Sequence, residues 1–241
     1  MNPPPSESGY TQCPIIHQDS RFIVVHKPPG ILSHPNATGP AERAAFQGRF
    51  DAERKSFSTP AGTVWLMHRL DQDTSGVLVG TLDAEAAAHC RTSFEQGRVQ
   101  KTYLSLLFGS PQPAGTWKDA LVTQREKGRV RTIVQRGVRP NAELSYRVVA
   151  QNRTQRITLV EINLITGRTH QIRVQAASRH TPVVGDDVYG DFTRNKAFRK
   201  AMGIRRLCLH ACRLSLPHPN TGAMLTFHAP EPPEWTSMSG N

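Results

Sequence analysis

Several features that would narrow the class of protein are missing from this sequence of 241 residues. It contains only four cysteines, and they form neither a CxxC pair nor the spacing of a disulfide framework. No stretch reaches the roughly 18 apolar residues that a membrane-spanning helix needs. The first residues, MNPPPSESGY, lack a basic start and an apolar segment, so we expect no secretory signal. We therefore expect a cytoplasmic protein of a reducing compartment, without membrane contact.

Acidic residues are also few. The chain has 30 Lys and Arg against 19 Asp and Glu, which leaves a net charge of +11. This excess is larger than solubility requires, so a polyanionic partner is the leading explanation, and a generically basic protein is the alternative. Charge by itself does not identify an activity.

The segment CLHAC at 208–212 contains three potential metal ligands. In a strand these side chains share one face but lie roughly 6.6 Å apart, too far to converge on one ion. A helix would align the two cysteines and turn His210 away. We therefore interpret the segment as small residues of a core and expect no metal.

The pattern of apolar residues predicts the elements of the fold. We expect one domain at 15–230, between a flexible tail at 1–14 and a C-terminal tail at 231–241. Strand-like stretches outnumber helical ones and do not alternate with them, which predicts an α+β fold with a mixed sheet. Residues 35–62 suggest an irregular surface excursion with a short helix at 42–46. Strands are predicted at 21–26, 99–108, 120–124, 130–135, 142–149, 156–164 and 206–216, and helices at 83–94 and 169–178, capped by Asp83 and Thr169.

Residues 68–76 read HRLDQDTSG and lie between the apolar runs 65–67 and 77–79, so we expect a loop between two strands. The second acid, Asp73, and the hydroxyl residues after it suit the backbone of a turn. Asp71 is different, because it directly follows Leu70 at the edge of an apolar run. A carboxylate there is partly desolvated and costly unless a cation or a hydrogen-bond donor accompanies it. A reactive acid is one explanation for such a position.

Two further segments carry polar groups in unusual places. GRTHQIR at 167–173 puts Arg168, His170 and Arg173 near a predicted helix start, where phosphate or a carboxylate could bind. Tyr103 of the KTY segment lies in a strand otherwise full of leucine, where a core tyrosine with a bonded hydroxyl is the structural alternative.

A basic cluster occupies the tip and return arm of the predicted hairpin at 120–135. Exposed charge near a turn is usually only solvated, but no comparable acidic set offsets this one. A phosphate-facing tip and a solvated tip both remain open interpretations. The basic residues are Arg125, Lys127, Arg129, Arg131 and Arg136.

Together, these segments resemble a known family. The order and separation of five segments resemble those of the RluA family of pseudouridine synthases. The segments are HRLDQDTSGVLV, KTYL, GRTHQIRVQ, PVVGDDVYG and RLCLHA. The resemblance extends from about Arg21 to Leu216, and HKPPGILSHP at 26–35 is similar to the opening strand and turn of the family. Many relatives carry an S4-type RNA-binding domain before the catalytic core. The residues before the first predicted strand are too few to form one.

The resemblance implies an enzyme that isomerises uridine in ribosomal or transfer RNA, on a mostly antiparallel sheet with flanking helices and loops. It implies that Asp71 is the catalytic aspartate, that Tyr103 lies against the target base and that Arg173 pairs with Asp71. It also implies that no metal or organic cofactor takes part. We expect a monomer whose partner is RNA. The expected RNA-binding residues are Arg69, Arg168 and His170, with Arg125, Lys127, Arg129 and Arg131 of the hairpin.

Elementary chemistry agrees with these roles. Cleavage of the glycosidic bond leaves the sugar carbon electron-poor, and an ionised carboxylate can trap or stabilise it. Tyr103 could take or relay the proton that leaves carbon 5 of a flipped-out base. One alternative is a catalytically silent RNA-binding module of the same fold. Another is a glycoside hydrolase that uses Asp71 and Asp73, which a strand would place roughly 6.6 Å apart.

Overall fold

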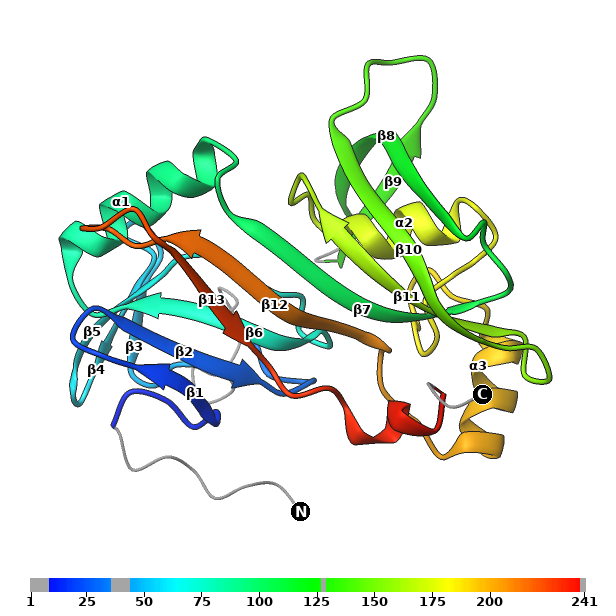
Figure 1. The fold of residues 1–241 in the computed structure, drawn as a ribbon, viewed down its shortest axis with the longest axis horizontal. Helices are drawn as coiled ribbons and strands as arrows, with labels where there is room; N and C mark the ends of the chain where they lie inside the picture. The colour runs from blue at the N-terminus through cyan, green and yellow to red at the C-terminus, as the bar shows by residue number, and fades with distance from the viewer. Residues whose placement is uncertain (1–8, 36–43, 127–128, 239–241) are drawn as a thin grey trace. The chain divides into compact units, whose positions relative to one another are not determined.

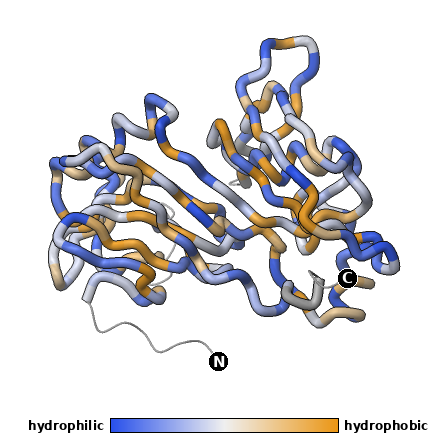
Figure 2. Tube along the Cα trace, viewed as in Figure 1, coloured by the Kyte–Doolittle hydropathy of each residue, from blue (hydrophilic) through white to orange (hydrophobic). Residues whose placement is uncertain are grey.

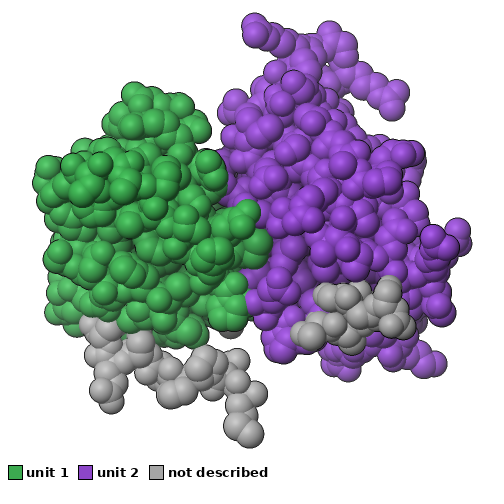
Figure 3. All heavy atoms as spheres, viewed as in Figure 1, with its two compact units in different colours: residues 1–100, 211–230 green, residues 101–210, 231–241 purple. Residues whose placement is uncertain are grey.

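The computed structural model describes residues 9–35, 44–126 and 129–238. The chain forms two compact units, each with its own strands and buried residues (Figures 1 and 3). Unit 1 comprises residues 1–100 and 211–230, and unit 2 comprises residues 101–210 and 231–241. The sequence predicted one domain at 15–230 and did not indicate this division.

Unit 1 is built from short antiparallel strands of the first 100 residues and of residues 211–230. β6 (Ser75–Thr81) is buried along its whole length and pairs with the full length of β2 (Phe22–Lys27). β2 also pairs with β1 (Ile15–Gln18). β12 (Leu209–Pro217) pairs with β13 (Met224–His228). The strands predicted at 21–26 and 206–216 are therefore confirmed as β2 and β12.

The segment 35–62 is not the irregular excursion that the sequence predicted. It contains β3 (Arg49–Asp51) and β4 (Ser56–Thr59), and β4 pairs with β5 (Gly62–Leu66). The predicted helix at 42–46 is also wrong for its described part, because Ala44 and Phe46 form β-bridges. Residues 36–43 lie outside the described part of the chain.

One helix covers the core of unit 1. α1 (Ala84–Glu95) confirms the helix predicted at 83–94, and the Asp83 side chain accepts a hydrogen bond from the Ala86 amide, as predicted for its cap. The buried core under α1 includes residues of β2, β6, β12 and β13. Figure 2 shows hydrophobic stretches along these strands.

Both predicted tails are partly packed. Thr11 and Cys13 are buried, and Thr11 forms a bridge with Phe46 and a hydrogen bond to the Ala45 carbonyl. At the other end, η2 (Pro233–Met238) contains Trp235, which is buried. Packed structure therefore begins before Pro14 and continues beyond residue 230.

Unit 2 contains the longer strands. β7 (Gln100–Phe108) pairs with β11 (Ile157–Leu164), which pairs with β10 (Ala142–Asn152). β10 also pairs with β8 (Ala114–Glu126), which forms a hairpin with β9 (Arg129–Gln135). All of these pairings are antiparallel, so the predicted α+β fold with a mostly antiparallel sheet is confirmed.

The described part of unit 2 contains two α-helices besides the 3-10 helix η2. α2 (Gln171–Ala177) packs Val174 against Leu121 and Ala142 of the sheet. α3 (Phe192–Met202) follows and ends at Gly203. The prediction that Thr169 caps α2 is wrong. His170, in the left-handed conformation, precedes the helix and provides no side-chain cap.

None of the helices in the described ranges is both long and apolar enough to cross a membrane.

Candidate active site

The loop that carries Asp71 joins β5 to β6, as the sequence predicted. The segment that follows β2 forms hydrogen bonds with the residue before Asp71 and with the residue after it. On one side, the Ser33 hydroxyl donates to the Leu70 carbonyl and accepts from the Leu70 amide, each at 2.9 Å. On the other side, the Gly30 amide donates to the Gln72 carbonyl at 3.0 Å. The backbone at Asp71 is therefore clamped between two fixed neighbours.

A buried lysine strengthens this clamp. Lys27, at the end of β2, is 0% exposed. Its ammonium group donates to the carbonyls of Pro28, Ile31 and Gln72 at 3.0, 2.7 and 2.8 Å. A buried ammonium is costly unless its donors are satisfied, and here it joins the HKPPG turn to the residue after Asp71. Lys27 thereby fixes the backbone of Gln72, a contact that the sequence analysis did not identify.

The histidine of HRLD has a structural role. His68 accepts a hydrogen bond from the Val79 amide at 3.1 Å through Nε2, and its ring stacks on Phe94 at 5.7 Å. It thereby ties the loop to β6 and to α1. Asp71 is partly exposed, and Arg69 and Asp73 are exposed.

The glycine of TSG is required by close packing within unit 1. Gly76 has φ of 121° and its position leaves no room for a side chain, because a β-carbon there would lie 2.2 Å from the Ala211 carbonyl oxygen. The loop therefore returns to β6 at a point where only glycine fits against β12.

Arg173 lies in unit 2 and forms a buried ion pair that the sequence analysis missed. Its Nε donates to Asp186 at 2.7 Å and its Nη2 donates to the other carboxylate oxygen at 2.9 Å. The side chains of Arg173 and Asp186 are 6% and 0% exposed. This bidentate geometry fixes the plane of the guanidinium group. The motif PVVGDDVYG indicated this acid, but the sequence analysis assigned it no role.

Asp186 is held ionised by its neighbours. Burial alone would raise the pKa of this carboxyl group. The hydrogen bonds and charge of Arg173, with the amides of Tyr189 and Val188, outweigh burial, so the pKa lies below its usual value. Asp186 is therefore a fixed negative charge under Arg173.

Tyr189 completes this cluster. The Arg173 guanidinium carbon lies 5.2 Å from the centre of the Tyr189 ring. The Tyr189 hydroxyl is 2.8 Å from His170 Nδ1 and accepts from the Thr132 amide at 2.8 Å. The motifs GRTHQIR and PVVGDDVYG thus meet, and the second is bonded to β9 of the basic hairpin.

A buried glutamine, and not Thr169, forms the side-chain hydrogen bonds at the beginning of α2. The side-chain oxygen of Gln171 accepts from the Arg168 amide and the Thr166 hydroxyl at 3.0 and 2.8 Å. Arg168 is exposed, and its Nε donates to the Asn141 carbonyl at 3.0 Å. Further along the helix, Gln175 and Arg179 both bind Asp119 of β8. α2 is therefore anchored to the sheet at both ends.

Tyr103 is 7% exposed and lies opposite Ile162 in the pairing of β7 with β11. This position suits both a core tyrosine and a tyrosine at the edge of a closed site. Burial lowers the pKa of the neighbouring Lys101. A β-carbon at Gly167 would lie 3.6 Å from the Lys101 ammonium group, so the KTY and GRTHQIR motifs are adjacent.

Asp71 belongs to unit 1, whereas Tyr103 and Arg173 belong to unit 2. The pairing of Arg173 with Asp71 therefore stays a prediction.

The basic hairpin is formed by β8 and β9, as predicted. Arg131 and Arg136 are exposed. Lys127 and the side chains of Arg125 and Arg129 lie outside the described part of the structure. Exposed apolar residues accompany the arginines, namely Val122, Val130 and Ile133, each 37% exposed. The hairpin thus presents charge beside apolar surface.

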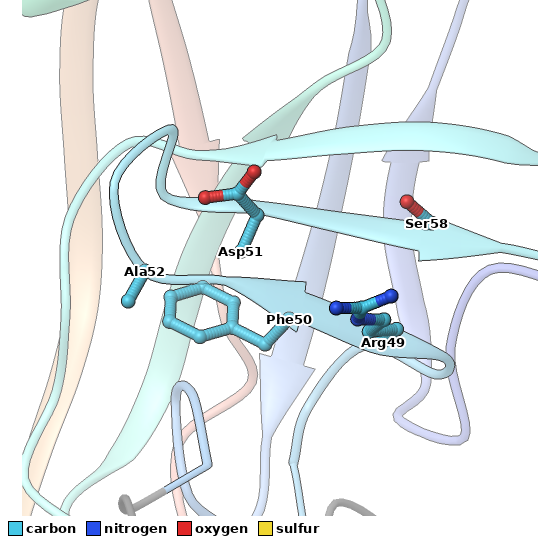
Figure 4. A pocket seen from close by; sticks show the side chains of 5 residues that line it. All are labelled: Arg49, Phe50, Asp51, Ala52 and Ser58. Atoms are coloured by element: carbon cyan, nitrogen blue, oxygen red, sulfur yellow. The ribbon is translucent and has the colours of Figure 1, made fainter.

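A pocket of about 480 Å³ lies on the β3–β4 hairpin of unit 1 (Figure 4). Its lining residues do not include Asp71, and they combine one basic and one acidic side chain with a phenyl ring. The residues are Arg49, Phe50, Asp51, Ala52 and Ser58.

The cysteines are not arranged as a metal site. Cys208 is buried, and burial raises the pKa of its thiol to about 12. Within the described ranges, no group of three or more His, Cys, Asp or Glu residues could hold a metal ion. The interpretation of CLHAC as part of a core agrees with β12, in which Leu209, His210 and Ala211 are buried.

The fold is similar to solved structures. The human RNA pseudouridylate synthase domain containing 4 aligns with a TM-score of 0.67 and 26% identity, over 91% of this chain and 88% of that one. The human RNA pseudouridylate synthase domain containing 1 aligns with a TM-score of 0.70 and 24% identity, over 95% and 86%. The fold is therefore that of a pseudouridine synthase domain.

Sequence comparison agrees with the fold. A family model described as RNA pseudouridylate synthase matches residues 21–178, a segment that contains Asp71, Tyr103 and Arg173. An uncharacterized RNA pseudouridine synthase of Bacillus subtilis is 30% identical, over 95% of this chain and 72% of its own length. The tRNA pseudouridine synthase C of Yersinia pestis is 32% identical, over 93% and 88%. The ribosomal large subunit pseudouridine synthase C of Vibrio vulnificus is 33% identical, over 90% and 65%.

The chain belongs to the RNA pseudouridylate synthase family, and within it to the RluA type that its motifs resemble. It is therefore an isomerase that acts on RNA. It spans most of the Yersinia relative but less than two thirds of the Vibrio relative.

Proposed function

We propose that this protein converts specific uridines of ribosomal or transfer RNA to pseudouridine, with Asp71 as the catalytic aspartate acting on a flipped-out uridine. One observation carries the proposal. The residues on both sides of Asp71 are held by Ser33, Gly30 and Lys27, while Asp71 itself is partly exposed. Reacting groups are effective when a rigid scaffold presents them to the substrate.

The reaction requires the roles that we assign. The bond from the ribose carbon to N1 of uracil breaks, the base turns, and a bond from the same carbon to C5 forms. The carboxylate of Asp71 either attacks the sugar or removes a sugar proton, so it must be ionised at the start. The C5 proton then leaves and N1 gains a proton, which makes the product an isomer of the substrate. No redox partner or group donor is required.

Arg173 is proposed to stabilise the ionised form of Asp71. A cation close to a carboxylate favours its charged form. Arg173 is prepared for such a role, because Asp186 fixes its Nε and Nη2 and Tyr189 lies against its guanidinium group. Tyr103 is proposed to contact the base and to take or relay the C5 proton.

The silent RNA-binding module remains the alternative to this proposal. Membership of the family leaves the glycoside hydrolase without support. The test is incubation of the purified protein with ribosomal and transfer RNA from a strain that lacks it. Pseudouridine is then mapped by chemical adduct formation and primer-extension stops. New sites in one class of RNA are expected, and binding without any new site would leave only the silent module.

We propose the β8–β9 hairpin as an RNA contact. The double variant Arg131→Glu and Arg136→Glu should weaken RNA binding and reduce the slope of log affinity against log salt by about 1.5, since each lost phosphate contact removes about 0.7–0.9. The measurement is fluorescence anisotropy of labelled transfer RNA over a range of KCl concentrations. The matched control is Arg54→Glu and Arg98→Glu, two exposed arginines of unit 1. Equal losses in both variants would indicate a general effect of net charge.

A further inference from the structure

α3 lies beyond the segment 21–178 that the family model matches, and one of its sides is unusual. Phe192, its first residue, is 78% exposed, more than any other large apolar residue of the described chain. Asp191 caps the helix by accepting from the Arg194 amide at 3.0 Å, so the position of Phe192 is fixed by the helix start. An exposed aromatic ring at a fixed backbone position needs an explanation other than the core.

The same side of α3 is basic. Asn195 and Phe198 face the interior and are buried. Lys196 and Lys200 follow Phe192 at intervals of four residues, so they lie on its side of the helix, and both are exposed. Arg199 lies on this side too and pairs with Asp187 at 3.4 Å, with both side chains exposed.

A second segment adds charge next to this helix. The turn between β10 and β11 contains Arg153 and Arg156, both exposed. Between them, the Gln155 side chain donates to the sulfur of Met202 at the end of α3. Figure 1 shows this turn beside α3, and Figure 2 shows it as hydrophilic. The sequence from 192 to 206 contains six basic residues and no acid.

We propose that α3 and the β10–β11 turn form a second RNA-binding surface, which holds a part of the substrate outside the nucleotide being isomerised. The cations would bind phosphates, and the Phe192 ring would stack on an unpaired base. This inference rests on the proposed function for the identity of the RNA. We call this the α3 surface and define it by Phe192, Lys196, Arg199, Lys200, Arg153 and Arg156.

RNA fits the α3 surface better than a membrane does. An interfacial helix needs a broad apolar face with several large side chains, whereas this side of α3 carries a single aromatic residue followed by cations. An isolated ring beside a row of positive charges is the arrangement that binds single-stranded nucleic acid, because every base has a face on which a ring can stack.

The first experiment removes the charge. Lys196→Glu with Lys200→Glu is compared with Arg54→Glu and Arg98→Glu, and each is measured by anisotropy with a labelled 20-residue oligouridylate over a KCl series. The α3 variant should lower the salt slope by about 1.4, because single strands release about 0.7 ion per phosphate contact. A slope equal to that of the wild type, or an equal change in the control, would overturn the proposal.

The second experiment removes the ring. Phe192→Ala should weaken binding of the oligouridylate about tenfold and leave the salt slope unchanged, because stacking involves no phosphate. Binding of a 20-base-pair RNA duplex should change little, because its bases are already stacked. Ile165→Ala is the control, since Ile165 is also exposed, at 54%. Equal losses on both RNAs would contradict stacking. Phe192-dependent binding to vesicles of phosphatidylcholine and phosphatidylserine, with RNA binding intact, would assign the surface to membranes.

These results can be separated from a failure of the proposed function. Both experiments measure binding alone and can be repeated in the Asp71→Asn protein. If RNA binding depends on Lys196 and Lys200 but no pseudouridine is formed, the α3 surface is supported and the proposed reaction is not. If pseudouridine is formed and RNA binding does not depend on Lys196 and Lys200, only the proposal of the α3 surface is wrong.

Discussion

Replacing Asp71 by asparagine should abolish pseudouridine formation and leave RNA affinity within a few fold of the wild-type value. Asparagine preserves the shape of the side chain but has no negative charge with which to attack or stabilise the sugar carbon. We expect a loss of about 10³-fold or more in the single-turnover rate, as is typical when a group in direct contact with the reacting atoms is removed. The rate is measured with transfer or ribosomal RNA that lacks the modification.

Asp73 provides the matched control for this experiment. It lies two residues away in the same loop and is exposed, so Asp73→Asn should retain most of the activity. If Asp71→Asn still turns over at the wild-type rate, our assignment of the catalytic acid is wrong. If both variants lose RNA affinity to the same extent, the loop as a whole has been disturbed.

Replacing Asp186 by asparagine should have the largest effect on stability. The change leaves the Arg173 guanidinium buried at 6% exposure without its negative partner. Breaking a buried pair by removing one partner costs about 3–5 kcal/mol. The free energy of unfolding is measured by urea denaturation. Activity should also fall, because the guanidinium group proposed to face Asp71 loses its fixed orientation.

The pH dependence of this effect follows from the pKa of Asp186. The folded-state pKa lies below the unfolded value of about 3.9. The stabilisation is therefore fully present above the unfolded pKa and is lost as the pH falls through the folded pKa. The difference in unfolding free energy between wild type and Asp186→Asn should be constant from about pH 5 to 8 and should shrink below about pH 4.

Asp187 is the control for Asp186. It is the next residue, and its carboxylate pairs at 3.4 Å with Arg199 at the surface, where the two side chains are 73% and 41% exposed. Exposed pairs contribute little, so Asp187→Asn should change stability by less than about 1 kcal/mol. Equal effects of the two substitutions would show that burial of the Arg173 pair is unimportant.

Much of the fold could be predicted because its elements have strong local patterns. β2, β7 and α1 were all expected, and Asp83 caps α1 as predicted. The strands β3 and β4 were missed because they have only three and four residues, too few for alternation to stand out from a loop. The cap of α2 was misassigned because the helix begins one residue later, after His170 in the left-handed conformation, and the ring of His170 contacts a hydroxyl that is distant in sequence, that of Tyr189.

The prediction of the site was limited in a similar way. Asp71 was identified from its position at the edge of an apolar run. Asp186 and Lys27 were not, although both are in segments whose resemblance to the family was recognised. Their roles depend on partners 13 and 45 residues away in the chain, Arg173 and Gln72. Local sequence patterns carry no information about such partners.

The sequence by itself determined the family, the α+β class, the basic character and the acid proposed to react, because each depends on residue types and their order. Only the tertiary structure decided which buried charges meet. A buried ammonium or carboxylate is tolerated only where donors and acceptors from distant segments converge on it. Lys27 under the Asp71 loop and Asp186 beside Arg173 are two such places. The α3 surface likewise depends on the tertiary structure, because the fold brings the β10–β11 turn next to α3.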